Sequence, residues 1–287
     1  MRNLGSSLRQ YSAALRLLLV MTVVLGVAYP LAVWGVSRAP GLAHRADGSI
    51  ITRDGKPVGS ALIGQAFTDS KGNPLVQYLQ SRPTAGAYDP TATTASNLGP
   101  ESIVDKPDAP SLLTQVCSRS KAVGELERVD GSRPYCTDGG VGAVLAVFYA
   151  EPSYRGDVVR VVSVNEPCPA TPFLRTYEGV RVECAPEGAD LAKGKLVPVR
   201  GDAPSDPAVP PDAVTASGSS IDPEISLDYA RLQQARIARA RGITTAQVAA
   251  VIDSIATGRD LGFMGTEKVN VLKVNLALDA EYPYRGN

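Results

Sequence analysis

Residues 17–36 read LLLVMTVVLGVAYPLAVWGV, twenty consecutive residues without a charged side chain. As a helix rising about 1.5 Å per residue, this stretch spans the roughly 30 Å hydrocarbon core of a bilayer. A cleaved signal peptide is the alternative, but its apolar core usually has only about 7–15 residues. The stretch therefore predicts a transmembrane helix near the amino end.

The charges around this helix predict its orientation. Arg2, Arg9 and Arg16 precede it, and no acidic residue does. Because basic residues favour the cytoplasmic side, we expect a single-pass protein of the cell membrane with a cytoplasmic N-terminus and an extracytoplasmic soluble domain. Pro30 lacks an amide proton, so it should kink the helix or mark a site where partner helices pack. A simple bent tether is equally compatible with the pattern.

The overall composition excludes several functional classes. The 287 residues include 29 Lys plus Arg and 29 Asp plus Glu, so charge gives no reason to expect a nucleic-acid partner. His44 is the only histidine, which argues against a histidine-based metal centre. The 27 glycines and 22 prolines favour a turn-rich soluble region over a long helical bundle.

The four cysteines all follow the predicted transmembrane helix: Cys117, Cys136, Cys168 and Cys184. On the outer side of a membrane such thiols pair, so we expect two disulfides, with all three connectivities open. The spacing contains no C-x-x-C pair, and we therefore predict neither a zinc site nor a redox motif.

The soluble part reads as an α+β domain with a β-rich insertion. Residues 48–66 predict a hairpin around an Asp-Gly-Lys turn, and the frequent Gly and Pro of residues 81–102 predict an irregular loop. The β-branched runs at 141–149 and 158–164 predict strands within a disulfide-stapled insertion at 103–213, whose last residues form a Pro-rich linker.

Beyond the linker the pattern becomes helical. Asp222 with Pro223 predicts a helix start, and Gly242 predicts its end. Thr244 with Gln247 is a capping-box pattern for a second helix that we expect to end near Gly258. Residues 268–279 fit a strand at their start and a helix at their end, so their type stays open. The first helix carries four arginines that suit either an anion site or a solvated face: Arg231, Arg236, Arg239 and Arg241.

Catalytic motifs are absent from the sequence. It has no phosphate-binding P-loop, no G-x-S-x-G, no H-E-x-x-H and no DKTGT aspartyl-phosphate motif. Ser118-x-x-Lys121 matches one element of penicillin-binding proteins without the other two, which chance explains. For an anchored outer enzyme, the only acid or base candidates are Asp89, Glu101 and His44.

Five segments carry a family resemblance, and they occur in this order: GSALIGQAF at 59–67, SRPTAGAYDP…SNLGPES at 81–102, VTASGSSIDPEIS at 214–226, RIARARG at 236–242 and VNVLKVNLALD at 269–279. Together with the single anchor they resemble the KdpC family, the C subunit of the Kdp potassium-transporting P-type ATPase. The resemblance covers about 15–101 and 214–279. The cysteine-bearing insertion departs from shorter family members, and its role is not implied.

The resemblance implies a non-catalytic accessory subunit in a four-component pump. Its partners would be a channel-like potassium-binding subunit (KdpA-like), an ATP-hydrolysing subunit (KdpB-like) and a small peptide subunit (KdpF-like). The family is also described as a catalytic chaperone that raises ATP affinity through a glutamine, which looks like Gln233 here. No cofactor is required by the sequence, and ATP is implied only by this resemblance. An outer location would separate Gln233 from cytoplasmic ATP.

We therefore expect an outer cap that docks on the potassium-selecting subunit. Three residues of the 81–102 loop are candidates for docking. Arg82 offers a guanidinium group that donates hydrogen bonds, Tyr88 an aromatic anchor and Asn97 an amide. The alternative is that this loop packs on its own domain. The predicted organisation is a cytoplasmic N-terminus at 1–16, the transmembrane helix at 17–36, soluble domain at 37–102, the insertion at 103–213 and a helical part at 214–287.

Overall fold

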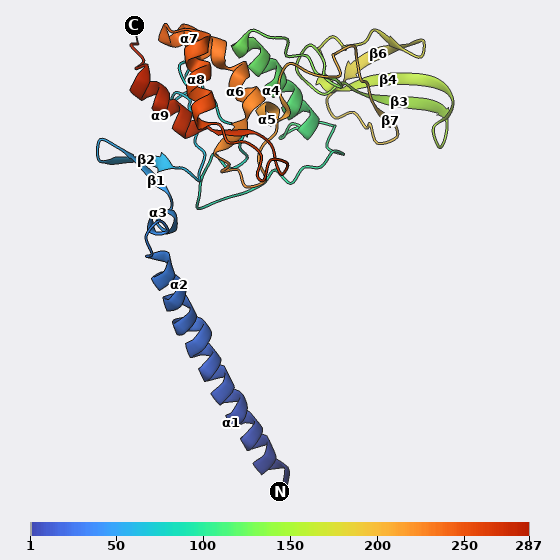
Figure 1. The fold of residues 1–287 in the computed structure, drawn as a ribbon. Helices are drawn as coiled ribbons and strands as arrows, with labels where there is room; N and C mark the ends of the chain where they lie inside the picture. Colours follow the sequence, from blue (N-terminus) through green and yellow to red (C-terminus); the bar gives the residue numbers. More distant parts are fainter. Residues whose placement is uncertain (1, 287) are drawn as a thin grey trace. The chain divides into compact units, whose positions relative to one another are not determined.

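The computed structural model describes residues 2–286 (Figure 1). Side chains are described from residue 8 onward. The chain divides into two compact units, the first ending at Leu62 and the second beginning at Ile63. The domain boundaries expected from the sequence remain predictions.

A long apolar helix dominates the first unit, in three parts: α1 (Arg2–Val23), the π-helical turn η1 (Val24–Ala28) and α2 (Tyr29–Ser37). From Leu8 to Ser37 it is long and apolar enough to cross a membrane, and its most apolar stretch is not buried within the protein. The amide of Tyr29 donates to the carbonyl of Val24, five residues back. This wider turn lies directly before Pro30, which has no amide proton to donate.

A short helix and a hairpin complete the first unit: α3 (Ala43–Ala46), β1 (Ile50–Arg53) and β2 (Lys56–Ser60). The strands pair antiparallel, which confirms the predicted hairpin. Asp54 and Gly55 have φ angles of 51° and 75°. Positive φ at both central residues is what a tight turn between twisted strands requires, and Asp-Gly supplies it at low cost.

A five-stranded sheet forms one side of the second unit, in the order β5 (Thr176–Tyr177), β6 (Val180–Ala185), β4 (Arg155–Pro167), β3 (Val144–Glu151) and β7 (Lys195–Pro198). Only β4 and β6 pair in parallel. Leu145 and Val147 lie in one apolar cluster, whereas Val144 and Ala146 lie in another. This alternation shows that β3 buries both faces. The strands confirm both predicted β-branched runs.

Both predicted disulfides are present, and their pairing is now defined. Cys168 and Cys184 join the end of β4 to β6, with Cα atoms 5.1 Å apart. Cys117 and Cys136, with Cα atoms 5.4 Å apart, join a helix to the loop before the sheet. The two bridges therefore link neighbouring segments, each closing a short loop.

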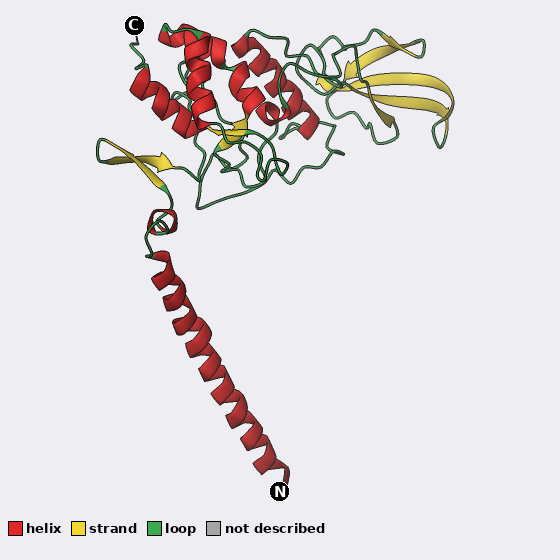
Figure 2. Cartoon of the chain, in the orientation of Figure 1, coloured by secondary structure: helices red, strands yellow, loops and turns green. Residues whose placement is uncertain are grey.

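That helix is α4 (Leu112–Glu127), which the sequence analysis did not identify within the β-rich segment that it predicted at 103–213. Ser111 caps it by accepting the Thr114 amide at 3.1 Å. Leu113 packs against the sheet, while Val116 and Val123 pack against the helical core. Because α4 contacts both, it joins the sheet to the helices (Figure 2).

The remaining elements form the helical side of the second unit: α5 (Pro211–Val214), β8 (Glu224–Ser226), α6 (Leu227–Leu232), α7 (Gln234–Arg241), α8 (Thr245–Ile255), β9 (Lys268–Asn270) and α9 (Val271–Glu281). The predicted helix start at Asp222 is wrong. Residues 224–226 pair with β9, and Ser226 caps the helix by accepting the Tyr229 amide. Ile225 is buried in this pairing, which outweighs the local Asp-Pro signal.

Other helix predictions are confirmed. Gly242 closes α7 in a left-handed conformation, and Thr244 with Gln247 forms the complete capping box of α8. Helix α8 ends at Ile255 and not near Gly258. Residues 268–279, whose type was open, contain both β9 and most of α9.

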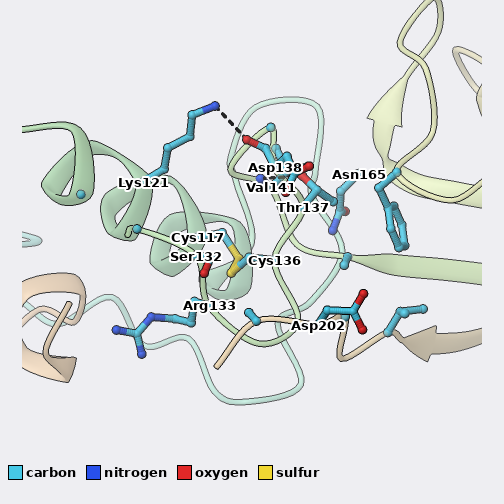
Figure 3. A pocket seen from close by; sticks show the side chains of 18 of the residues that line it. Cys117, Lys121, Ser132, Arg133, Cys136, Thr137, Asp138, Val141, Asn165 and Asp202 are labelled. Atoms are coloured by element: carbon cyan, nitrogen blue, oxygen red, sulfur yellow. Dashed lines mark hydrogen bonds between the residues drawn. A yellow bond between two sulfur atoms is a disulfide. The ribbon is translucent and has the colours of Figure 1, made fainter. Parts of the chain in front are cut away.

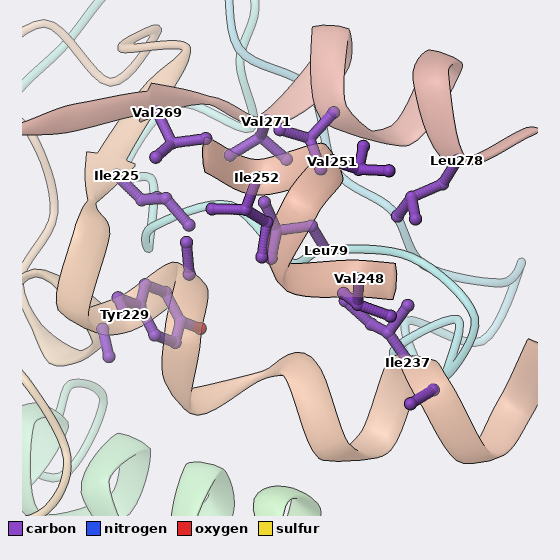
Figure 4. Close-up of a cluster of buried hydrophobic side chains, with 14 of the residues drawn as sticks. Leu79, Ile225, Tyr229, Ile237, Val248, Val251, Ile252, Val269, Val271 and Leu278 are labelled. Atoms are coloured by element: carbon purple, nitrogen blue, oxygen red, sulfur yellow. The ribbon is translucent and has the colours of Figure 1, made fainter. Parts of the chain in front are cut away.

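The helical core surrounds a piece of irregular chain. Leu79 is fully buried among side chains of α7, α8 and α9, including Ile237, Ile252 and Leu278 (Figure 4). The segment that carries Leu79 lies far from these helices in sequence. Its backbone therefore needs hydrogen-bond partners that no strand or helix of its own supplies.

Candidate functional site

Residues 76–80, here called the clamped segment, belong to no helix or strand. Each of its five carbonyl groups nevertheless accepts a hydrogen bond from a side chain of α7, α9 or the residue between α6 and α7. Most of those donors lie in the RIARARG and VNVLKVNLALD segments singled out in the sequence. These motif residues therefore replace the partners that a neighbouring strand would provide.

Two side-chain amides pair with the clamped segment in the manner of a strand. The Oε1 atom of Gln233 accepts the Gln80 amide at 2.7 Å, and its Nε2 atom donates to the Gln80 carbonyl at 3.2 Å. Asn275 makes the same two bonds with Leu79, at 2.7 and 2.9 Å. Gln233 is fully buried and Asn275 is 2% exposed, so both amides are locked inside the core.

Two arginines bind the remaining carbonyls. Arg236 donates from Nη1 to the Val76 and Tyr78 carbonyls at 2.7 and 2.9 Å. Arg241 donates from Nε to the Gln77 carbonyl at 2.9 Å and from Nη2 to Asp279 at 2.8 Å. The predicted arginine cluster is thus divided, because these two guanidinium groups point into the protein.

Arg236 also holds a buried ion pair. Its Nε atom lies 2.9 Å from Oε1 of Glu127 at the end of α4, and the two side chains are 5% and 1% exposed. Burial raises the pKa of Glu127, and it outweighs the nearby Arg236 charge, which lowers that pKa. The Oε2 atom of Glu127 has no hydrogen-bond partner among the described residues. This pair ties α4 to α7 at a site where a lone charge would be costly.

The 81–102 loop is held by the VTASGSSIDPEIS segment. Arg82 lies 3.1 Å from Asp222 and also donates to the Thr215 carbonyl at 3.3 Å. The Tyr88 hydroxyl donates to the Arg82 carbonyl. A Cβ added at Gly64 would come within 2.5 Å of both the Asp222 carbonyl and the Tyr88 ring. Gly64 therefore permits the close packing of three separate motif segments.

These contacts show where the predicted site residues lie. Tyr88 is buried, and burial raises the pKa of its hydroxyl. Arg82 is half-buried, and Asn97 is exposed with a φ of 52°. Gln233 is fully enclosed, so the structure brings it together with the clamped segment and not with the loop residues. Docking by Arg82, Tyr88 and Asn97 stays a prediction.

A cavity of about 1400 Å³ lies between α4, the loop that follows it and the segment after β4. The Cys117–Cys136 disulfide lies beside it, and Lys121 donates to the Asp138 carbonyl at 2.9 Å (Figure 3). Its charged lining mixes both signs, including Lys121, Arg128 and Arg133 with Asp130 and Asp202. This mixture selects no single class of ligand. Among residues 2–286, no group of three His, Cys, Asp or Glu side chains could hold a metal ion.

Sequence reasoning missed Glu127 and Asn275. Asn275 had a signal, because it is a lone polar residue on the apolar face of the last helix, and a buried amide needs a partner. Glu127 had no such signal in the sequence, because its partner, Arg236, is more than a hundred residues away. As described, these groups bind backbone and one another, which suits a rigid scaffold.

Comparison with known proteins agrees with the motif segments. A model of the family described as "K+-transporting ATPase, c chain" matches residues 11–133 and 189–280. The match runs further than the 15–101 and 214–279 expected from the motifs. The unmatched residues between its two parts contain β3, β4, β5 and β6 of the sheet and three of the four cysteines.

Individual relatives match over nearly the whole chain, and each is named potassium-transporting ATPase KdpC subunit. One from Kineococcus radiotolerans is 36% identical over 98% of both chains. One from Mycobacterium tuberculosis strain H37Rv is 33% identical over 94% of this chain and 98% of its own. One from Methylibium petroleiphilum is 34% identical over 94% of this chain and 97% of its own. On this evidence the chain belongs to the KdpC family, the c chain of the K⁺-transporting ATPase.

Proposed function

We propose that this chain is a non-catalytic subunit that assembles with, and stabilises, the channel-like and ATP-hydrolysing subunits of a potassium-uptake ATPase. The observation that carries the proposal is the apolar helix Leu8–Ser37. Among the described residues, no other part of the chain buries its most apolar stretch. The internal use of the motif side chains supports the same function, because a scaffold needs rigidity more than reactive groups.

The proposed location is the cell membrane, with the second unit outside. Two observations support it. Arg9 and Arg16 precede the most apolar part of the helix, and basic residues favour the cytoplasmic side. Both cysteine pairs have disulfide geometry, and disulfides persist in oxidising compartments.

Thiol alkylation tests this orientation. Cells are quenched with acid, the full chain is denatured, and a mass-tagged maleimide is added with or without prior reduction. We expect no tagged cysteine without reduction and four after it. Four tagged thiols without reduction would place the second unit in a reducing compartment and contradict the proposal.

Replacement of the helix tests assembly. In the full chain, residues 17–36 are exchanged for an unrelated apolar helix of equal length, and a hairpin variant, Lys56→Ala, serves as a control at an exposed residue. We expect the control to co-purify with the potassium-binding and ATP-hydrolysing subunits at wild-type yield and the exchanged chain to lose most of that yield. Failure of the wild-type chain to co-purify with either subunit would reject the proposed function.

A role in raising ATP affinity is the family-based alternative. ATP binding would need the Gln233 amide to leave the Gln80 backbone, because its Oε1 and Nε2 atoms both form hydrogen bonds with Gln80. Equilibrium dialysis of the full chain with ATP at millimolar concentration tests it. Binding by the wild type that is lost in Gln233→Ala, with the fold intact, would support this alternative.

A further inference from the structure

The chain turns repeatedly where the apolar helix of the first unit ends. The Ala39 amide donates to the Val36 carbonyl, and the Leu42 amide donates to the Ala39 carbonyl, each at 3.0 Å. Helix α3 follows directly, and its four residues rise only about 6 Å. A chain held in consecutive turns does not extend, so this segment stays close to the end of the helix.

Side chains also tie this segment to the helix and to the hairpin. The guanidinium carbon of Arg38 lies 5.7 Å from the ring centroid of Trp34, and its Nη1 atom lies 3.1 Å from Oδ1 of Asp47, the residue after α3. The Ser60 hydroxyl at the end of β2 donates to the Gly48 carbonyl at 2.6 Å. The base of the hairpin is thereby joined to the end of α3.

Trp34 marks the level of the membrane surface on a helix that crosses a bilayer. It is 60% exposed and lies one turn before the helix ends, and Trp concentrates where hydrocarbon meets headgroups. The headgroup region extends about 5–7 Å beyond the hydrocarbon core on each side. Residues 38–60, here called the collar, begin at that level and therefore lie in or against the headgroups.

The collar presents basic and apolar side chains together. Its Lys and Arg residues outnumber its carboxylates four to two, with Arg38, Arg45, Arg53 and Lys56 against Asp47 and Asp54. Leu42 and Ile50 are 41% and 44% exposed. Apolar groups beside an excess of cations are typical of segments that lie in the plane of a membrane surface.

The hairpin register places two cations directly opposite each other. Arg53 pairs with Lys56 across the turn, and like charges in opposed positions repel. Arg45 and Lys56 are both exposed, and neither forms an ion pair among the side chains that the structure describes. Folding of the hairpin would be served better by opposite charges, so this arrangement suits an anion outside the chain.

We propose that the collar binds the phosphate groups of anionic phospholipids. Arg45, Arg53 and Lys56 contact the headgroups, while Leu42 and Ile50 lie among the first carbons of the acyl chains. The inference rests on the membrane span of the proposed function and adds a lipid site to it, and it holds for either orientation of the helix. Lipids with net negative charge are preferred, because a zwitterionic headgroup carries a cation that repels the same side chains.

Native mass spectrometry of the full chain tests the lipid preference. The chain is reconstituted in nanodiscs of equal phosphatidylglycerol and phosphatidylcholine, released, and scored for the two lipids that it retains. We expect the wild type to retain phosphatidylglycerol preferentially. The double variant Arg45→Gln with Lys56→Gln should lower the ratio of the two lipids at least about fivefold, because each cation near an anionic surface is worth about that factor.

A matched control removes the same two charges elsewhere. Arg181→Gln with Lys193→Gln also replaces one exposed Arg and one exposed Lys, but in the second unit. This pair should leave the lipid ratio unchanged. Both double variants should keep the wild-type thermal midpoint and co-purify normally with the other subunits, because the collar contacts lipid.

Photocrosslinking in the full complex tests the position of the collar. Leu42→p-benzoylphenylalanine is introduced into the full chain in membranes, and its product is identified by mass spectrometry. The same substitution at Tyr154, a 50% exposed residue in the turn between β3 and β4, is the control. We expect a lipid adduct at position 42 and none at position 154.

The outcomes separate this inference from the proposed function. A wild-type lipid ratio equal to that of the bilayer, an equal loss in both double variants, or a protein adduct without a lipid adduct at position 42 overturns the lipid site and leaves the subunit role standing. Release of the wild-type chain from membranes by alkaline carbonate overturns the membrane span and the lipid site together. Preferential retention that only the collar variant loses, with a lipid adduct at position 42, establishes the site.

Discussion

Replacement of Gln233 by alanine separates an internal structural role from a nucleotide contact. The substitution removes the amide that accepts from the Gln80 amide and from Nη2 of Arg236, each at 2.7 Å, and that donates to the Gln80 carbonyl. Gln80 and Arg236 are themselves 8% and 4% exposed, so water reaches the orphaned groups poorly. We therefore expect a large loss of stability.

The magnitude follows from the groups left without partners. An unsatisfied buried donor or acceptor costs about 1–3 kcal/mol, and the two backbone groups of Gln80 both lose their partner. The free energy of unfolding should thus fall by about 2–6 kcal/mol. With a denaturant dependence of about 3 kcal/mol per molar urea, the unfolding midpoint should fall by about 1 M.

Urea unfolding of the full chain in detergent, followed by circular dichroism, measures this shift. Gln234→Ala is the matched control, because Gln234 is the next residue, at the start of α7, and is partly exposed. The control should change the free energy of unfolding by no more than about 0.5 kcal/mol. If both variants unfold at the wild-type midpoint, the clamp argument is refuted, and a role of Gln233 in binding gains support.

Three further predictions follow from the second unit. Gly64→Ala should destabilise the full chain by several kcal/mol in the same urea assay, whereas Gly258→Ala should be nearly neutral, because an added Cβ meets nothing within 4 Å there. The pKa of Glu127 in the folded state lies above its value in the unfolded state, so its contribution to stability is present at low pH and is lost as pH rises from the unfolded-state pKa through the folded-state pKa. Glu127→Gln should remove that part of the pH dependence, and an unchanged plot of urea midpoint against pH would contradict the assignment. Removal of the Cys117–Cys136 bridge, which closes a loop of 19 residues, should lower the thermal midpoint and cost about 3 kcal/mol, and equal midpoints with and without reductant would show that the bridge adds no stability.

Local patterns in the sequence predicted local structure well. The Asp54-Gly55 turn, the capping box at Thr244 and the closing Gly242 depend on backbone geometry within a few residues, which the residue types reveal. The start of α6 was missed because pairing with β9 decides it. A strand partner more than forty residues away leaves no mark on the Asp222-Pro223 dipeptide itself.

The candidate site was predictable in part. The motif segments and the family were visible from the sequence, whereas the function of each motif side chain was not. Gln233 and Arg236 look like exposed polar residues on a helix until the clamped segment is placed beside them. Their roles depend on contacts that span 153 and 160 residues of sequence, beyond the reach of any periodicity argument.

The bonds between the clamped segment and the last helix have a consequence for biosynthesis. The backbone of Leu79 is hydrogen-bonded to Asn275, 196 residues later in the sequence. The middle of the core therefore cannot reach its final packing while the chain is still being synthesised. Until the final helix has left the ribosome, the backbone groups of Leu79 lack their Asn275 partner, and the apolar side chains that α9 covers stay exposed. A nascent chain stalled before residue 275 should therefore be a client of holdase chaperones, and even a short loss at the carboxyl end should turn a stable protein into a substrate for proteases.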